Sequence, residues 1–181
     1  MQQAGYQVRF GFGVEGLRAC ASDADIIIWV DALPTPTPTP MPTPTMIDDR
    51  FAHLVSAAPA LATLISANLP TSRVAAQWVL DHQTNVNRRL AIAVIAASPV
   101  YAVDDFLAAG SVIDALSELG LDATSPEAAA AEAAYRGLKN AVAHVMSASV
   151  AGREIAPERA RLRVDTDATV ADVVVIRDVR S

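Results

Sequence analysis

Residues Asp25–Asp31 read DIIIWVD, five consecutive apolar residues with an acid at each end. A short apolar run with no polar alternation is typical of a strand that is buried on both faces of a sheet. Leu90–Ala96 (LAIAVIA) and Val170–Ile176 (VADVVVI) have the same character. Gln7–Phe12 instead alternates polar and apolar residues, which predicts a half-buried strand. These four segments predict a sheet with buried central strands.

Helix signals lie in the intervals between these strands. Capping residues at Thr71–Ser72, Asp104–Asp105 and Ser125–Glu127 each precede apolar residues at three- and four-residue spacing. The third helix is predicted to continue through Val145. Strands that alternate with helices predict the α/β class, as a three-layer α/β/α domain with a largely parallel or mixed sheet. At 181 residues the whole chain, 1–181, is expected to form this single domain.

Composition and charge exclude several classes of protein. An apolar content of 52% excludes a wholly disordered chain. The net charge of −6 and the pI near 4.9 argue against a nucleic-acid-binding groove. No apolar run reaches the length of a membrane span, and the first residues lack the features of a signal peptide. With Cys20 as the single cysteine, we expect a cytoplasmic protein, and homo-oligomer formation is left open.

The segment Leu33–Thr45 reads LPTPTPTPMPTPT and interrupts the α/β pattern. Its six prolines lack amide donors, which predicts an extended surface segment without regular secondary structure. It is interpreted as a Thr-Pro linker or loop, either inserted or replacing a lost segment. The alternative is a ligand for a proline-recognising module, although the strict alternation lacks a P-x-x-P register.

Gly11–Gly16 matches the G-x-G-x-x-G pattern of dinucleotide-binding folds. The helix after it can be only about two turns long before Ser22, and Glu15 would lie beside the pyrophosphate. A glycine-rich turn is therefore the preferred interpretation of this pattern.

Three acids follow buried strands. Asp31 ends the strand that begins at Asp25, and Asp104 and Asp105 follow the next strongly apolar strand after a short loop. Sites of open α/β sheets lie at the carboxyl ends of the strands, where carboxylates can bind Mg²⁺. The alternative is that Asp31 only ends a strand and Asp104 only caps a helix.

Seven stretches in collinear order resemble the 2-phosphosulfolactate phosphatase family, the ComB-like proteins, and most closely its actinobacterial branch. They cover about three quarters of the chain, and no single one is highly specific. The stretches are VRFGFGVEGLRA (8–19), DADIIIWVDAL (23–33), VAAQWVL (74–80), RRLAIAVIAAS (88–98), DDFLAAGSVIDAL (104–116), SPEAAAAEAAYRGL (125–138) and AGREI (151–155).

The resemblance implies Mg²⁺-dependent hydrolysis of a small anionic phosphate ester on a three-layer α/β fold. Asp31 and Arg153 would be catalytic. The implied metal ligands are Asp31, Asp104 and Asp105, and the implied phosphate-binding residues are Arg73, Gly152 and Arg153. Gly110 matches the glycine of the family's helix after the acidic pair.

Several departures from the family pattern fall in loops. Pro34 replaces the start of a helix, and Leu69–Thr71 stands where the family carries Leu-Arg-Asn. The loop Ser98–Val103 is shortened and lacks a Gly-Glu-Arg motif, and Ala151 replaces a serine. Two hypotheses follow, a divergent Mg²⁺-dependent phosphatase and a degenerate, non-catalytic homologue that acts as a binding or interaction module. Because lost cations lower phosphoryl-transfer rates, weak or no hydrolysis is expected.

Overall fold

The computed structural model describes residues 3–33, 44–155 and 173–179. The strands are β1 (Val8–Phe12), β2 (Ile26–Val30), β3 (Thr63–Ala67), β4 (Ile92–Ala96) and β5 (Val174–Arg177). The helices are α1 (Gly13–Cys20), α2 (Pro44–Ala57), α3 (Ser72–Val86), α4 (Val103–Glu118), α5 (Pro126–Leu138), α6 (Val142–Ala148) and α7 (Val150–Glu154), with a 3₁₀ turn at Lys139–Ala141.

The strands form one mixed sheet in the order β1-β4-β2-β3-β5. The first four are parallel, and β5 pairs antiparallel with β3 at the edge. In the register of the parallel strands, Ala96 of β4 pairs with both Phe12 of β1 and Val30 of β2, and Val30 pairs with Ala67 of β3. The carboxyl ends of the four parallel strands therefore lie in one row.

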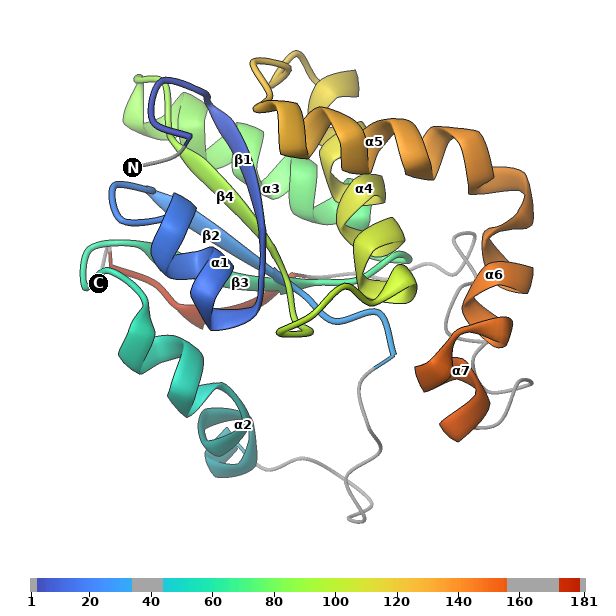
Figure 1. The fold of residues 1–181 in the computed structure, drawn as a ribbon. Helices are drawn as coiled ribbons and strands as arrows, with labels where there is room; N and C mark the ends of the chain where they lie inside the picture. Colours follow the sequence, from blue (N-terminus) through green and yellow to red (C-terminus); the bar gives the residue numbers. More distant parts are fainter. Residues whose placement is uncertain (1–2, 34–43, 156–172, 180–181) are drawn as a thin grey trace.

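Helices cover both faces of this sheet (Figure 1). On one face, α1 and α2 bury Leu17 and Leu54 against strand residues such as Ile27. On the other face, α3 and α4 bury Val79 and Leu107 in a cluster that includes strand residues such as Ile28. The fold is thus three-layered and of the α/β class, as predicted.

Chain order explains which helix lies on which face. The chain advances across the sheet from β1 to β2 to β3, and α1 and α2 lie on the same face. It then returns from β3 to β4, so that α3 lies on the opposite face, as right-handed crossovers require. Strand β4 lies between β1 and β2 in the sheet. The helix after β4, α4, therefore lies on one face of the sheet, whereas the helices after β1 and β2, α1 and α2, lie on the other face. Ligand sites of open α/β sheets lie at such a switch point.

Helix α4 packs against both the sheet and α5, and every residue from Leu107 to Leu116 is buried. At Gly110 a β-carbon would stand 2.2 Å from the carbonyl oxygen of Ala131 on α5. Only glycine permits this approach, which explains the glycine noted at this position in the sequence.

Two predicted elements differ in extent. The third helix ends at Leu138, and a 3₁₀ turn separates it from α6. The prediction was too long because the apolar spacing continues across this break in the helix. The strand predicted at Val170–Ile176 is β5, an edge strand whose Val174 and Val175 are exposed. Its apolar run was wrongly interpreted as a strand buried on both faces. Residues 170–172 lie outside the described residues.

Strand β3, helix α2 and the short helix α7 also did not emerge from the sequence. Strand β3 (TLISA) is too short and too mixed in polarity to show a period, although it lies inside the sheet between β2 and β5. Helix α2 begins at Pro44, inside the segment predicted to lack regular structure. Proline is tolerated in the first helical turn, since the amides there need no partner within the helix. Leu33, at the other end of that segment, is buried rather than on the surface, and residues 34–43 lie outside the described residues.

Within the described ranges, none of the helices combines the length and the apolar character needed to cross a membrane.

Candidate functional site

Asp105, in the first turn of α4, links the ends of two neighbouring strands. Its Oδ1 accepts a hydrogen bond from the Ala32 amide at 2.9 Å, just after β2. Its Oδ2 accepts one from the Ser98 amide at 2.9 Å, just after β4. The side chain is only 4% exposed. The carboxylate thus holds together the two strand ends at the switch point of the sheet.

Asp104 and Asp31 lie at the same edge. Burial raises the pKa of Asp104, and the negative charges of Asp105 and Asp31 raise it further. Asp104 is 5% exposed, and Asp31 is half-buried. The three acids that the sequence singled out therefore come together at the carboxyl ends of β2 and β4. An acid that is hard to ionise beside two other carboxyl groups is a feature typical of functional sites.

A site for Mg²⁺ requires several oxygen ligands in octahedral geometry. Asp105 directs both oxygens to backbone amides, which competes with coordination. Residues 3–33, 44–155 and 173–179 contain no group of three or more His, Cys, Asp or Glu side chains arranged to hold a metal ion. The described residues alone therefore do not fit the implied metal.

A cavity of about 450 Å³ opens beside Asp104, between the loop after β4 and the short helix α7. Most of its wall is apolar. Two carboxylates, those of Asp104 and Glu154, and the hydroxyl-bearing residues Ser98 and Tyr101 contribute its polar groups. The lining residues are Ser98, Val100, Tyr101, Ala102, Val103, Asp104, Val150, Ala151 and Glu154.

The two predicted arginines are not among the described residues that line this cavity. Arg73 is exposed in the first turn of α3, where its charge acts on Tyr135 of α5. Arg153 is exposed on α7, which contributes Val150, Ala151 and Glu154 to the cavity. The structure therefore brings the acids together, and it leaves both arginines off the cavity wall.

Gly152 lies in the corner between α6 and α7. A β-carbon there would stand 2.0 Å from the carbonyl oxygen of Met146. Ser149 Oγ completes the corner, because it donates to that carbonyl and accepts from the Gly152 amide, each at 2.9 Å. This packing explains the glycine of the Gly-Arg pair, and its phosphate-binding role stays a prediction.

The glycine-rich pattern at Gly11–Gly16 is a close strand–helix contact. A β-carbon on Gly11 would stand 2.8 Å from Cα of Gly16, so α1 packs directly on β1. Gly13 has a φ of 55°, and a β-carbon there would stand 2.7 Å from Cα of Pro99. The loop after β4 thus lies against the turn where a dinucleotide would place its pyrophosphate, which agrees with the preferred interpretation as a turn.

Thr71, the last residue of the stretch Leu69–Thr71 that departs from the family pattern, closes the turn before α3 together with Asn68. Thr71 Oγ1 donates to Asn68 Oδ1 at 2.8 Å, and the Thr71 amide donates to the same atom at 3.1 Å. Thr71 or Ser72 was expected to cap α3. Thr71 stands at the N-cap position, but its side chain accepts no hydrogen bond from that helix. Its hydroxyl is engaged by the preceding turn instead.

Tyr101 and Glu154 line the cavity and were not predicted from the sequence. A signal for Glu154 was present, because Val150, Ala151 and Glu154 follow the spacing that places residues on one face of a helix. No comparable signal marks Tyr101, whose place depends on the path of the loop. In comparisons with known proteins, no family model, no curated protein and no solved structure matches this chain.

Proposed function

We propose that this chain is a binding module on a ComB-like scaffold, which takes a small neutral or positively charged ligand at the carboxyl edge of its sheet and has weak or no phosphatase activity. The observation that carries the proposal is the lining of the cavity beside Asp104. Its charged lining residues in the described part of the chain are two acids, Asp104 and Glu154.

Charge complementarity supports this ligand class. A phosphate ester carries negative charge, and the catalysis of phosphoryl transfer depends on cations around its oxygens. In this cavity an ester would instead meet two carboxyl groups and apolar side chains such as Val100 and Val103. A neutral or cationic ligand can use the apolar wall and the acids together.

The second candidate is the Mg²⁺-dependent phosphatase that the sequence resemblance implies. The observation in its favour is the cluster of Asp31, Asp104 and Asp105, where burial and the neighbouring acids raise the pKa of Asp104. A cation at this edge would relieve the repulsion between the carboxylates. In that case Arg73 and Arg153 would have to approach the bound ester.

The two candidates are separated by titration with three compounds of similar size, namely cyclohexylammonium, cyclohexanol and cyclohexyl phosphate. The amide signals of Ser98 and Val100 in NMR spectra report binding at the cavity. We expect cyclohexylammonium and cyclohexanol to shift these signals, and cyclohexyl phosphate to leave them unchanged with or without Mg²⁺. Mg²⁺-dependent binding of the phosphate alone would overturn the proposal in favour of the phosphatase.

Glu154→Gln tests the electrostatic part of the proposal. It removes one of the two acids of the cavity, so it should weaken cyclohexylammonium binding several-fold and leave cyclohexanol binding unchanged. Glu118→Gln is the matched control, because Glu118 is an exposed acid at the far end of α4. Equal effects of the two substitutions on cyclohexylammonium binding would mean that the net charge of the protein, and not the Glu154 carboxylate, determines the affinity, which would contradict the proposal.

A further inference from the structure

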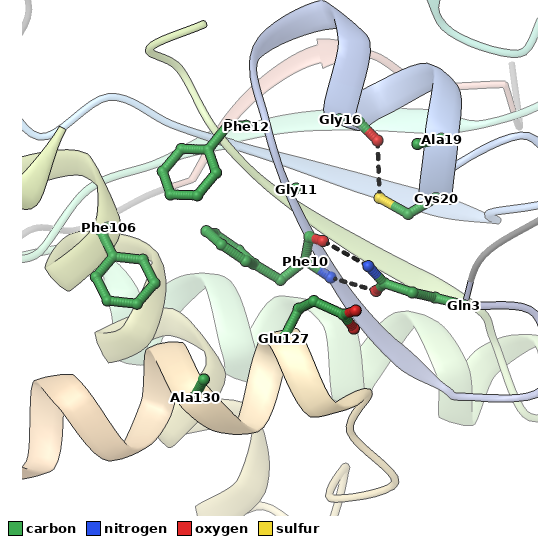
Figure 2. Close-up of a pocket in the computed structure, with 10 residues that line it drawn as sticks. All are labelled: Gln3, Phe10, Gly11, Phe12, Gly16, Ala19, Cys20, Phe106, Glu127 and Ala130. Carbon is green, nitrogen blue, oxygen red and sulfur yellow. Dashed lines mark hydrogen bonds between the residues drawn. The ribbon is translucent and has the colours of Figure 1, made fainter. Parts of the chain in front are cut away.

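A second cavity of about 380 Å³ lies beside β1, between α1 and the start of α5 (Figure 2). The site proposed above does not include it. The lining residues are Gln3, Phe10, Gly11, Phe12, Gly16, Ala19, Cys20, Phe106, Glu127 and Ala130. Its volume is within the range of pockets that bind small molecules.

The outer edge of β1 is already paired, which argues against a peptide strand as the occupant. The carboxamide of Gln3 donates to the Phe10 carbonyl and accepts from the Phe10 amide, both at 2.9 Å, as a neighbouring strand would (Figure 2). Nearer the start of β1, Val8 accepts from the Ser125 amide at 2.8 Å and donates to the Ala123 carbonyl at 3.1 Å. A small molecule is therefore the occupant that this edge admits.

Small residues create the space. The contact between Gly11 and Gly16 draws α1 onto β1, and Ala19 and Ala130 leave the opening between the helices unfilled. Ala130 is exposed on α5, so a larger side chain at this position can enter the cavity without disturbing the core.

Aromatic rings form one end of the cavity. Three of the four phenylalanines of the chain gather there, with ring centroids 4.9 Å apart for Phe10 and Phe12 and 5.7 Å apart for Phe10 and Phe106. Figure 2 shows these rings on one side and the Glu127 carboxylate directed toward Gln3 on the other. An apolar ring can pack on such side chains, and aromatic faces also attract cations.

Glu127 supplies the charge. It is the one charged side chain among the described residues that line the cavity. The neighbouring Cys20 thiol donates to the Gly16 carbonyl, and burial raises its pKa to about 11, so it is neutral near physiological pH. With the Gln3 carboxamide engaged by Phe10, Glu127 is left as the group that recognises a donor or a cation.

We propose that this cavity binds an aromatic ammonium ion, whose ring packs against Phe10, Phe12 and Phe106 and whose ammonium group pairs with Glu127. The proposal is independent of the site at the carboxyl edge. The evidence for it is the combination of a largely apolar wall, an aromatic end and, among the described lining residues, a single carboxylate.

The probes are benzylammonium, benzyl alcohol and phenylacetate, which share a ring and differ in charge. Titrations are followed at the Gly11 and Gly16 amide signals in NMR spectra of the full chain. We expect benzylammonium to bind most tightly, benzyl alcohol more weakly, and phenylacetate not at all at millimolar concentration. Phenylacetate binding as tight as that of benzylammonium, or no shift with any probe, would overturn the proposal.

Two substitutions with matched controls locate the ligand. Glu127→Gln should weaken benzylammonium binding about tenfold, since the acceptor loses its negative charge and keeps only a neutral hydrogen bond. Replacement of an exposed acid on α3, Asp81→Asn, should leave this binding unchanged. Ala130→Leu should abolish binding of both benzylammonium and benzyl alcohol by filling the cavity. Ala129→Leu changes the neighbouring exposed position, which does not line the cavity, and should leave the binding of both compounds unchanged. If Ala130→Leu folds normally and still binds benzylammonium as the unsubstituted chain does, the proposed location is wrong.

Discussion

The Oδ1 atom of Asp105 accepts a hydrogen bond from the backbone amide of Ala32 at 2.9 Å, across 73 positions of sequence. The bond joins the first turn of α4 to the end of β2, and the other oxygen of the same carboxylate holds the end of β4 through Ser98. A residue that sequence reasoning selected as a metal ligand therefore has a structural role at the site. The adjacent Asp104, in contrast, lines the cavity.

Replacement of Asp105 by asparagine should lower the free energy of unfolding by about 1–3 kcal/mol, because the new amide group would face a backbone donor that it cannot pair with. Denaturant titration of the purified variant measures this loss. Asp81→Asn, at an exposed position, serves as the control and should change stability little. If both variants unfold at the same denaturant concentration, the bridging role of Asp105 is not supported.

Asp104→Asn should have the opposite effect. Because burial and the neighbouring acids raise the pKa of Asp104 in the folded state, its ionisation costs stability. That cost is absent below the ordinary pKa of an aspartate, grows as the pH rises through the ordinary and then the folded-state pKa, and is fully present above both. Near neutral pH the variant should therefore be more stable, by the order of 1 kcal/mol.

The pH dependence of thermal unfolding checks this sign. The advantage of Asp104→Asn over the unsubstituted chain should shrink as the solution is acidified through the range where Asp104 becomes protonated. An advantage that stays constant with pH, or a loss of stability near neutral pH, would contradict the electrostatic origin assigned to it.

Gly110→Ala should destabilise the fold by about 1–3 kcal/mol, because the added methyl group would overlap the Ala131 carbonyl and force α4 and α5 apart. Gly137→Ala is the matched control on α5, where nothing lies within 4 Å of the added atom. It should stabilise the helix by about 0.5–1 kcal/mol, since alanine has the higher helix propensity. Thermal unfolding compares the two variants, and a neutral Gly110→Ala would mean that the helices are not in this close contact.

The Cys20 thiol should react slowly in the folded chain. Burial raises its pKa to about 11, and the side chain is 1% exposed. Only the thiolate is nucleophilic, so modification by dithionitrobenzoate near neutral pH should be roughly 100-fold slower in the folded protein than in denaturant. Similar rates in the two states would show that the thiol is accessible.

Much of the fold could be predicted because the central strands carry a local signal. Ile26–Val30 and Ile92–Ala96 are continuously apolar, and Ser125 caps α5 as expected, accepting a hydrogen bond from the Ala128 amide. Strand β3 carries no such signal, because five residues of mixed polarity show neither a helical nor a strand period. Its place in the sheet depends on pairing with β2 and β5, which is not a property of the segment itself.

The sequence likewise predicted one part of the candidate site and not the other. The convergence of Asp31, Asp104 and Asp105 could be predicted, because parallel strands bring their carboxyl ends to one edge. The hydrogen bonds that separate the role of Asp105 from that of Asp104 depend on side-chain direction within one helical turn. The cavity wall at Tyr101 depends on the path of a loop, for which the sequence offers no period.

The proposal that this chain has weak or no phosphatase activity is tested most directly by a phosphate-release assay with Mg²⁺ on 2-phosphosulfolactate and a panel of small phosphate esters, with Asp31→Asn as the control. The account predicts that the unsubstituted chain releases phosphate no faster than Asp31→Asn. Rapid release from any ester that Asp31→Asn abolishes would contradict it, and would identify a working phosphatase.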